Sequence, residues 1–546
     1  MLTPRLAIGI LLAASALLAQ APRVNPEAAP ASPSDTVAAM ALREQYRPDV
    51  QIMSSMARSL QTASSVSSEL KVQATNLTTA AQPYLRDGNT AEARKRLAQA
   101  VCILLGRDWN AREEYSASLV LRTDMTVADL SRPWVGQIAQ RYPVRLNVSG
   151  LRMRVSLAQG QIPSRSDTVV ETGKILEEVG TFDLASRDLT DEPYRFDIVP
   201  ARLKEGAYIV VAEVLDDNLP IGRLVTPVYF VRDLGARQAA IEKLVAKIDG
   251  HEGTKATALY PFDLARGINT GRRDVNGFDW PVEIQRAEEI AQALASGIDP
   301  LYQAKGDNRR NYRFTEAGEI MPYRVFVPSK WNGTAKLPTI LALHGANLDE
   351  NNMLTRDNNA MQKLAEQHGY IVAAPLGYRI NGAYGNRGMA GGPGAVLDAT
   401  LLRQTELSEE DVLNVLELVA EEYHVDRSRI YLMGNSMGGA GTYYIGSKYP
   451  EKFAALAPCA AGIGAPGSDE PPAFPFDRLK GVPLMTVVGD LDGGMAGVRS
   501  TVKMLKEHGL EPQYVEVKGG THGTAIQIAM PQIFDFFDAH SRRADR

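Results

Sequence analysis

The strongest structural signal in this 546-residue chain lies at residues 429–444, which read RIYLMGNSMGGAGTYY. The apolar run before Gly434 predicts a buried strand, and the stretch after it, up to Tyr449, predicts a helix. Between them, Gly434, Ser436 and Gly438 form the pattern G-x-S-x-G. A Cβ at either glycine would collide with neighbouring elements in so sharp a turn. We therefore expect Ser436 on a strained strand-to-helix turn with its hydroxyl exposed.

The surroundings of Ser436 favour a nucleophile over an ordinary glycine-rich turn, although a chain with 46 glycines could form the pattern by chance. A serine hydroxyl needs a base to take its proton, and histidine has a suitable pKa. We assign this role to His522, which follows a predicted strand at 514–517 within the sequence GGTHG. The other histidines precede this domain, end predicted helices, lie in the tail or shape another loop: His251, His368, His424, His508, His540 and His344.

Two carboxylates could orient the imidazole of His522. Asp490 and Asp492 both follow the predicted strand at 484–488. We favour Asp492, because G-x-x-D at this strand end is the commoner hydrolase arrangement, whereas Asp490 would hydrogen-bond its own loop. The chain order Ser436, Asp492, His522 is the order of the α/β-hydrolases and differs from that of two unrelated protease folds.

An acyl-transfer site also needs backbone donors for the oxyanion of its tetrahedral intermediate. The N–H of Met437, directly after Ser436, is one expected donor. The loop after His344 should supply the second, with Ala346 as the donor and Asn347 lining the acyl site.

The region around this motif alternates between strand and helix. Apolar runs at 323–327, 339–343 and 370–375 predict buried strands, mostly parallel and flanked by helices. Ser408 with Asp411 three residues later predicts a capping box that opens a helix. We place this α/β-hydrolase domain at residues 306–546.

Three regions precede that domain, so the predicted fold is multidomain. Residues 36–140 have apolar groups at helical spacing and predict an all-α segment. Residues 141–233 change to a period of two, as in Val144, Leu146 and Val148, and predict a small antiparallel β-sandwich similar to immunoglobulin-like modules. Residues 234–305 predict a helical connector. The sandwich could contact a polysaccharide or only space the domains.

The first residues predict export. Arg5 precedes an apolar stretch at 6–18 and small residues, which indicates a signal peptide at 1–21. Pro, Ala and Ser dominate 22–35, which predicts a disordered linker. The apolar stretch is shorter than the roughly 20 residues that cross a bilayer. We expect a secreted or periplasmic protein without stable membrane insertion.

Composition excludes several other functions. The formal net charge of -5 offers no basic surface for nucleic acid. Seven histidines and two cysteines show none of the close paired spacings that hold zinc, so we expect neither a metal nor another cofactor. Cys102 and Cys459 fall in different predicted regions, and a disulfide between them has no local support.

Four segments, 343–347, 429–443, 449–459 and 521–523, resemble the esterase and polyhydroxybutyrate depolymerase-like branch of the α/β-hydrolases, which includes feruloyl esterases. The resemblance covers the C-terminal part only, and it implies hydrolysis of a carboxylic ester on a small molecule or a polymer. The chain departs from many relatives in having Gly493–Met495 where they have a valine-proline step. Tyr378 and Tyr384, in a Gly- and Asn-rich stretch at 377–394, are candidate substrate contacts. A serine peptidase of this fold, or a polymer-binding protein with an inactive hydrolase domain, remain alternatives.

Overall fold

The computed structural model describes residues 49–62, 65–144, 146, 150–160, 172–184, 188–199, 203–273, 277–390, 399–463 and 474–542. The chain divides into two compact units. The N-terminal unit holds the residues up to 240 together with 264–285, and the C-terminal unit holds 241–263 together with 286–546. The division falls within three helices of the predicted connector, which are α6 (Leu234–Val245), α7 (Glu252–Asn269) and α8 (Trp280–Ala295).

The N-terminal residues that carry the export prediction, 1–21 with the linker at 22–35, lie outside the described residues. Among the helices of the described part, none is long and apolar enough to span a bilayer. Both cysteines are buried and free, with Cys102 in the N-terminal unit and Cys459 in the C-terminal unit.

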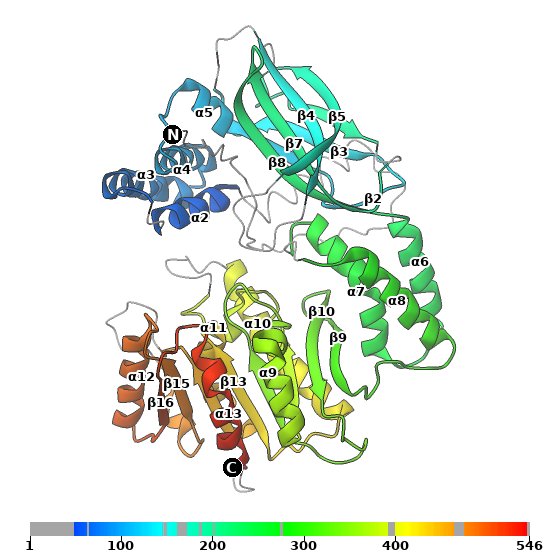
Figure 1. Cartoon of the computed structure of the whole chain (residues 1–546), viewed down its shortest axis with the longest axis vertical. Helices are drawn as coiled ribbons and strands as arrows, with labels where there is room; N and C mark the ends of the chain where they lie inside the picture. Colours follow the sequence, from blue (N-terminus) through cyan, green and yellow to red (C-terminus); the bar gives the residue numbers. More distant parts are fainter. Residues whose placement is uncertain are drawn as a thin grey trace, which may run out of the picture. The chain divides into compact units, whose positions relative to one another are not determined.

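Helices open the described part of the N-terminal unit. They are α2 (Asp49–Thr62), α3 (Ser68–Arg86), α4 (Thr90–Leu104) and α5 (Ala111–Ser118). Polar side chains cap three of them: Ser67, Asn89 and Asn110 accept backbone N–H groups from the first turns of α3, α4 and α5. Apolar residues of α2, α3 and α4 bury one another in small hydrophobic clusters. Figure 1 shows these helices in blue.

Two sheets follow in the same unit. One has the antiparallel order β1 (Leu119–Thr123), β3 (Trp134–Gln140), β6 (Tyr194–Ile198). The other has the order β2 (Val127–Asp129), β8 (Leu219–Val231), β7 (Gly206–Asp216), β4 (Leu151–Gly160), β5 (Thr172–Asp183). Residues of both sheets share one hydrophobic cluster, in which Trp134 and Phe196 of the first join Met153 and Val210 of the second. The β2–β8 pair is parallel, and β2 lies in the region predicted to be helical, whereas the β4–β5, β4–β7 and β7–β8 pairs within 141–233 are antiparallel.

The helical prediction for residues 36–140 is wrong from Leu119 onward. The buried guanidinium of Arg94 on α4 donates to the carbonyl oxygens of Ala117 and Leu119, where α5 gives way to β1. Strand β1 then pairs with β3. These partners are distant in the chain, so local periodicity does not reveal them. The predicted strand through Val144 and Leu146 is wrong too, since both lie outside any strand, and residue 148 is outside the described part.

The C-terminal unit is built on one eight-stranded sheet. The strands from β16 to β12 run parallel, and β10 is antiparallel to both of its neighbours, β12 and β9. The strands in spatial order are β16 (Gln513–Val517), β15 (Met485–Gly489), β14 (Ala455–Cys459), β13 (Ile430–Asn435), β11 (Thr339–Leu343), β12 (Ile371–Pro375), β10 (Glu319–Val327) and β9 (Gly306–Phe314). The predicted mostly parallel sheet flanked by helices is confirmed for this unit.

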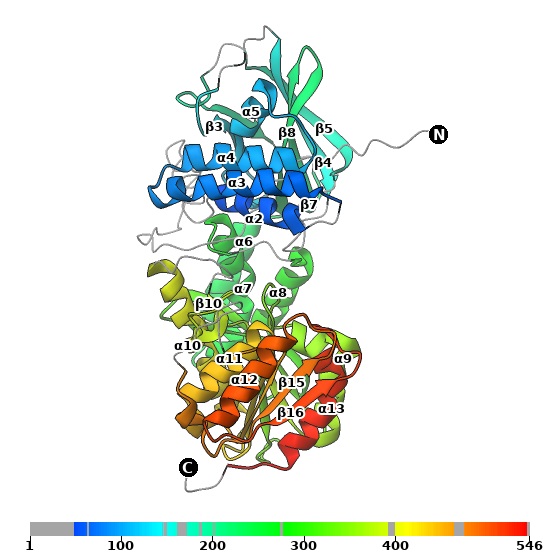
Figure 2. The ribbon, with the colours of Figure 1, turned by 90° about the vertical axis from the view of Figure 1, so that its left-hand side faces the viewer.

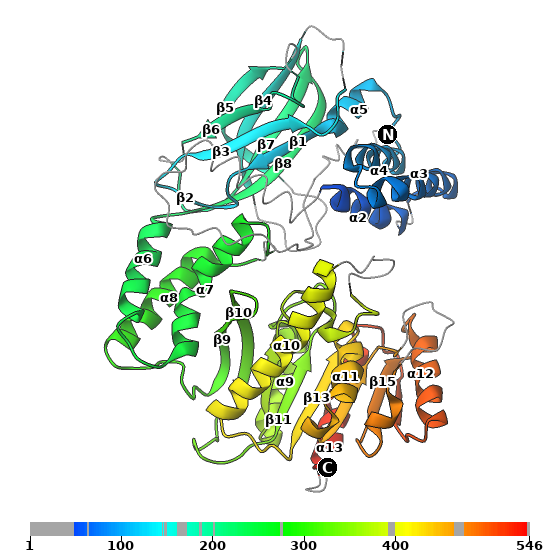
Figure 3. The same cartoon turned by 180° about the vertical axis from the view of Figure 1, so that it is seen from behind.

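Helices cover both faces of this sheet. Helices α9 (Asn352–His368) and α13 (Ala525–Asp538) share a hydrophobic cluster with the strands on one face. Helices α10 (Ala399–Glu422), α11 (Met437–Lys448) and α12 (Met495–Glu507) lie on the other, as Figures 2 and 3 show. With both faces covered, the central strands are buried throughout. The loops at their carboxyl ends therefore remain for chemistry.

The predicted helix start at Ser408 is wrong, because α10 already runs from Ala399. Ser408 and Asp411 are buried inside that helix, and neither caps it. Their oxygens accept hydrogen bonds from the chain after β12 instead, namely from the backbone N–H groups of Tyr384 and Tyr378. A tertiary contact has taken the place of the local capping pattern.

Candidate active site

Ser436 stands at the turn between β13 and α11. Its backbone has φ 57° and ψ −117°, a conformation that non-glycine residues rarely adopt. A Cβ on Gly438 would lie 2.2 Å from the carbonyl oxygen of Leu343, and one on Gly434 would lie 2.4 Å from that of Gly438. Both positions must therefore be glycine for the turn to close, and the serine is held in a strained conformation by the packing around it.

His522 and Asp492 meet Ser436 at the carboxyl edge of the sheet. The Nε2 atom of His522 lies 2.8 Å from Ser436 Oγ, and its Nδ1 atom lies 2.9 Å from Asp492 Oδ2. The Asp492 side chain is 3% exposed, and its other oxygen accepts the Gly494 N–H at 2.8 Å. The imidazole is 53% exposed. A half-exposed base against a buried carboxylate is an arrangement that can take a proton from the serine and stabilise the resulting imidazolium.

Asp490 points to a different partner. Its Oδ1 accepts the backbone N–H of Gly519 at 2.7 Å, at the start of the loop that carries His522. Of the two carboxylates that the sequence leaves open, the structure brings Asp492 to the imidazole and gives Asp490 a contact with the neighbouring loop.

The loop after β11 lies against the nucleophile. A Cβ on Gly345 would be 3.6 Å from the Cβ of Ser436, and the next residues, Ala346 and Asn347, are exposed. Asn347 has φ 62°, and its N–H donates to the carbonyl of Ile380 at 3.1 Å and to Oδ1 of Asn381 at 2.9 Å. The Asn381 amide returns a hydrogen bond to Asn347 Oδ1 at 2.8 Å. The expected oxyanion loop is thus held by the segment at 376–385.

His344 is buried, and its two ring nitrogens each lie 2.8 Å from a carbonyl oxygen, those of Gly345 and Leu376. The ring therefore holds the loop together, as the sequence interpretation of His344 expects.

Two predicted substrate contacts are corrected. Tyr384 is 0% exposed and Tyr378 is 5% exposed, so neither ring is presented to a ligand in this structure. The Tyr384 hydroxyl donates to the carbonyl of His344 at 3.1 Å, and burial raises the pKa of Tyr384 well above its ordinary value. The Arg379 guanidinium stacks 3.8 Å above the Tyr378 ring. The segment at 376–385 folds inward because its aromatic and polar groups find buried partners.

Sequence reasoning missed the role of Asp411 in supporting this segment. It accepts the Tyr312 hydroxyl at 2.6 Å and the Tyr378 N–H at 2.9 Å. Burial raises the pKa of Asp411 to about 6, although these hydrogen bonds oppose the shift. Beside it, Arg379 and Glu319 form a buried ion pair at 2.8 Å. The available signal was a carboxylate on the apolar face of a predicted helix, which needs a partner when it is buried.

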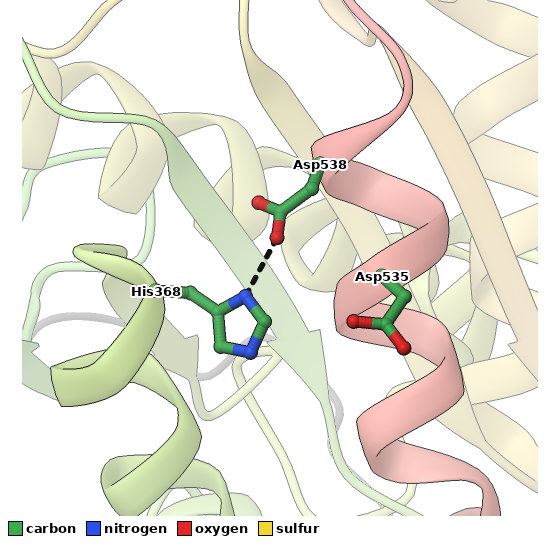
Figure 4. A group of neighbouring side chains, drawn as sticks. All are labelled: His368, Asp535 and Asp538. Carbon is green, nitrogen blue, oxygen red and sulfur yellow. Dashed lines mark hydrogen bonds and ion pairs between the residues drawn. The ribbon is translucent and has the colours of Figure 1, made fainter.

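Among the described residues, one cluster of metal-ligand types occurs away from this site, at the ends of α9 and α13 (Figure 4). The ligand atoms of His368, Asp535 and Asp538 lie within 4.8 Å of one another. His368 Nδ1 already pairs with Asp538 at 2.6 Å, and the Tyr370 hydroxyl donates to the same carboxylate at 2.7 Å. His368 and Asp538 thus already pair with each other and link α9 to α13, and Asp535 is exposed. We therefore assign no metal to this cluster.

A mostly parallel sheet with a serine on a strained strand-to-helix turn at its carboxyl edge defines the α/β-hydrolase class. Residues 315–475 match the family described as "Putative esterase". The fold and this match support an α/β-hydrolase esterase family for the C-terminal part of the chain.

Each relative matches only part of this chain. The chain is 31% identical over 145 residues to a bifunctional acetylxylan esterase/xylanase of Neocallimastix patriciarum, covering 27% of this chain and 18% of that protein. It is 30% identical over 140 residues to the S-formylglutathione hydrolase of Bos taurus, covering 24% of this chain and 49% of that protein. The chain thus spans less than half the length of either relative. A solved ferulic acid esterase from Anaeromyces mucronatus aligns at 19% identity with a TM-score of 0.35, over 44% of this chain and 95% of that one.

Proposed function

We propose that this protein is a serine hydrolase that cleaves carboxylic esters through an acyl-enzyme. The observation that supports this most strongly is the continuous hydrogen-bonded series from Ser436 Oγ through the His522 ring to the buried Asp492 carboxylate. The match of residues 315–475 to the esterase family favours an ester over an amide as the substrate bond.

The geometry supports a two-step reaction. His522 Nε2 takes the proton of Ser436 as its oxygen attacks the ester carbonyl, and Asp492 stabilises the imidazolium that forms. The N–H groups of Met437 and Ala346 donate to the oxyanion of the tetrahedral intermediate. His522 then returns the proton to the leaving alcohol, and a water molecule activated in the same way releases the acid from Ser436.

We infer that the substrate is an ester of a small acid, free or linked to a polymer. The related proteins include an acetylxylan esterase and an S-formylglutathione hydrolase, and both names denote small acyl groups. We also propose that residues 1–21 direct export, and that the strand-rich part of the N-terminal unit is an immunoglobulin-like sandwich that spaces the domains or contacts polysaccharide. The shared cluster of its two sheets supports a sandwich.

An ester panel on wild type and Ser436→Ala tests the proposal. With p-nitrophenyl acetate, methyl ferulate and a chromogenic peptide, we expect turnover of the esters, and Ser436→Ala should lower kcat by at least about 10⁴-fold. A fluorophosphonate should add its mass to Ser436 alone. Ser296→Ala, an exposed serine at the end of α8, is the control and should behave as wild type. Peptide cleavage without ester cleavage, or full activity of Ser436→Ala, would refute the proposal.

A further inference from the structure

Helix α9 is interrupted after its first turn. Arg356 has ψ 155°, and Asp357, Asn358 and Asn359 follow with φ of 56°, 56° and 59°. The left-handed conformation is unfavourable for L-residues, and Asn and Asp are the types that tolerate it best. A run of such residues persists only where the surrounding structure enforces it.

Both sides of the interruption are packed, so it is not a frayed end. Met353 and Leu354 before it, and Met361 and Ala365 after it, are all 0% exposed in the same hydrophobic cluster. An uninterrupted helix would direct the residue at 356 along a helix surface. Because of the interruption, the side chain at 356 points away from α9 instead.

Arg356 uses this freedom to reach the loop of the proposed base. Its Nη2 donates to the carbonyl oxygen of Gly523, the residue directly after His522. Its Nε pairs with Asp357 Oδ2 at 2.8 Å, and the Arg356 side chain is 15% exposed. Because Asp357 balances the charge, the guanidinium acts on the loop mainly through the direction of its hydrogen bonds.

Few hydrogen bonds from other parts of the chain hold the loop at 521–524 in place. All four of its residues are exposed. Its own hydroxyl contacts join Thr521 to Thr524, and the Asn435 amide reaches the carbonyl of His522 at 3.4 Å. Besides the contact of the His522 ring with Asp492, the bond from Arg356 is the charge-assisted one among the hydrogen bonds to this loop, and it acts on the backbone.

We propose that Arg356 is a positioning residue for His522, held in place by the left-handed interruption of α9. It fixes the carbonyl after His522, which keeps the imidazole in line with Ser436 Oγ. The inference rests on the proposed function, since it assigns the tether to a base that must take the serine proton. A displacement of the ring by about 1 Å is enough to slow such a step strongly.

The test compares Arg356→Ala with Arg324→Ala in the full chain. Arg324 is also 15% exposed and bonds Asn351 beside the start of α9, but it touches nothing in the 521–524 loop. Arg356→Ala should lower kcat on p-nitrophenyl acetate about 10- to 100-fold with KM within about twofold, and should slow fluorophosphonate labelling in parallel. Arg356→Lys, which keeps one donor, should recover part of kcat. Arg324→Ala should keep kcat.

Hydrogen exchange supplies a readout independent of activity. Amides of the peptide at 518–526 should exchange at least about fivefold faster in Arg356→Ala than in wild type or Arg324→Ala. Unchanged exchange, or faster exchange with unchanged kcat, overturns the positioning role. If exchange rises but wild type cleaves no ester and takes no fluorophosphonate, then the tether exists and the proposed function has failed.

Discussion

The two sides of Ser436 are built differently. On the base side, His522 is half exposed and its loop is anchored through backbone carbonyls by Asn435 and Arg356. On the oxyanion side, the loop at 344–347 rests on the segment at 376–385, whose own supports are buried, above all Tyr384 and Asp411. One side is thus a lightly anchored loop and the other a polar network inside the protein.

This difference fits the roles proposed for the two sides. The proposed base exchanges protons with the substrate, so its ring is half exposed while the hydrogen bond from Arg356 holds its loop. The oxyanion donors act by being in place before charge develops, so they gain from a rigid support. We expect substitutions on the base side to act mainly on kcat, and those in the buried network to act on stability as well.

The largest expected effect separates the two carboxylates of the base side. Asp492→Asn should lower kcat by about 10³- to 10⁴-fold, because the imidazole loses the group that orients it and stabilises its charged form. Asp490→Asn should cost less than about tenfold, since asparagine keeps an oxygen that can accept the Gly519 N–H. Steady-state kinetics on p-nitrophenyl acetate measure both. A larger loss in Asp490→Asn would reverse the assignment.

The second effect concerns the free energy of unfolding and how the buried Asp411 makes it depend on pH. Burial raises the pKa of Asp411 from 3.8 to about 6, so the folded state binds this proton more tightly than the unfolded state. Its stabilising contribution is present below about pH 4 and is lost as pH rises through about 6, which amounts to about 3 kcal/mol. Urea unfolding of wild type and Asp411→Asn at several pH values measures the difference. Parallel stability profiles of the two proteins would contradict the shift.

The smallest effect lies where the network meets the oxyanion loop. Asn381→Ala removes both side-chain bonds to Asn347 but leaves the bond from Asn347 to Ile380. We expect kcat to fall about tenfold, less than the loss of a whole oxyanion donor. Asn386→Ala is the control, because its side chain bonds only within its own turn, to Gly388. Equal rates in the two variants would show that the asparagine pair does not support the oxyanion loop.

Sequence reasoning identified Ser436 and His522 as candidates because the patterns that mark them are local. Apolar runs marked the strands of the C-terminal sheet, and glycines marked the turns at Ser436 and His522. For the acid it favoured Asp492 over Asp490 from the G-x-x-D spacing, but it could not test that choice by geometry, since the two carboxylates leave one turn in different directions. It placed Tyr378 and Tyr384 at the substrate, because a loop rich in Gly and Asn gives no sign that its aromatic rings turn inward.

The positions of the C-terminal strands along the chain, the glycine-flanked turn at Ser436 and the candidate residues for acyl transfer could be read from the sequence alone, because each is marked by a pattern of neighbours within a few positions. Tertiary structure decided which carboxylate meets the imidazole, why α10 carries Ser408 and Asp411 in its interior, and how Arg356 reaches Gly523. These choices depend on partners from distant parts of the chain. A polar group becomes a support only when burial removes water and a particular distant group replaces it.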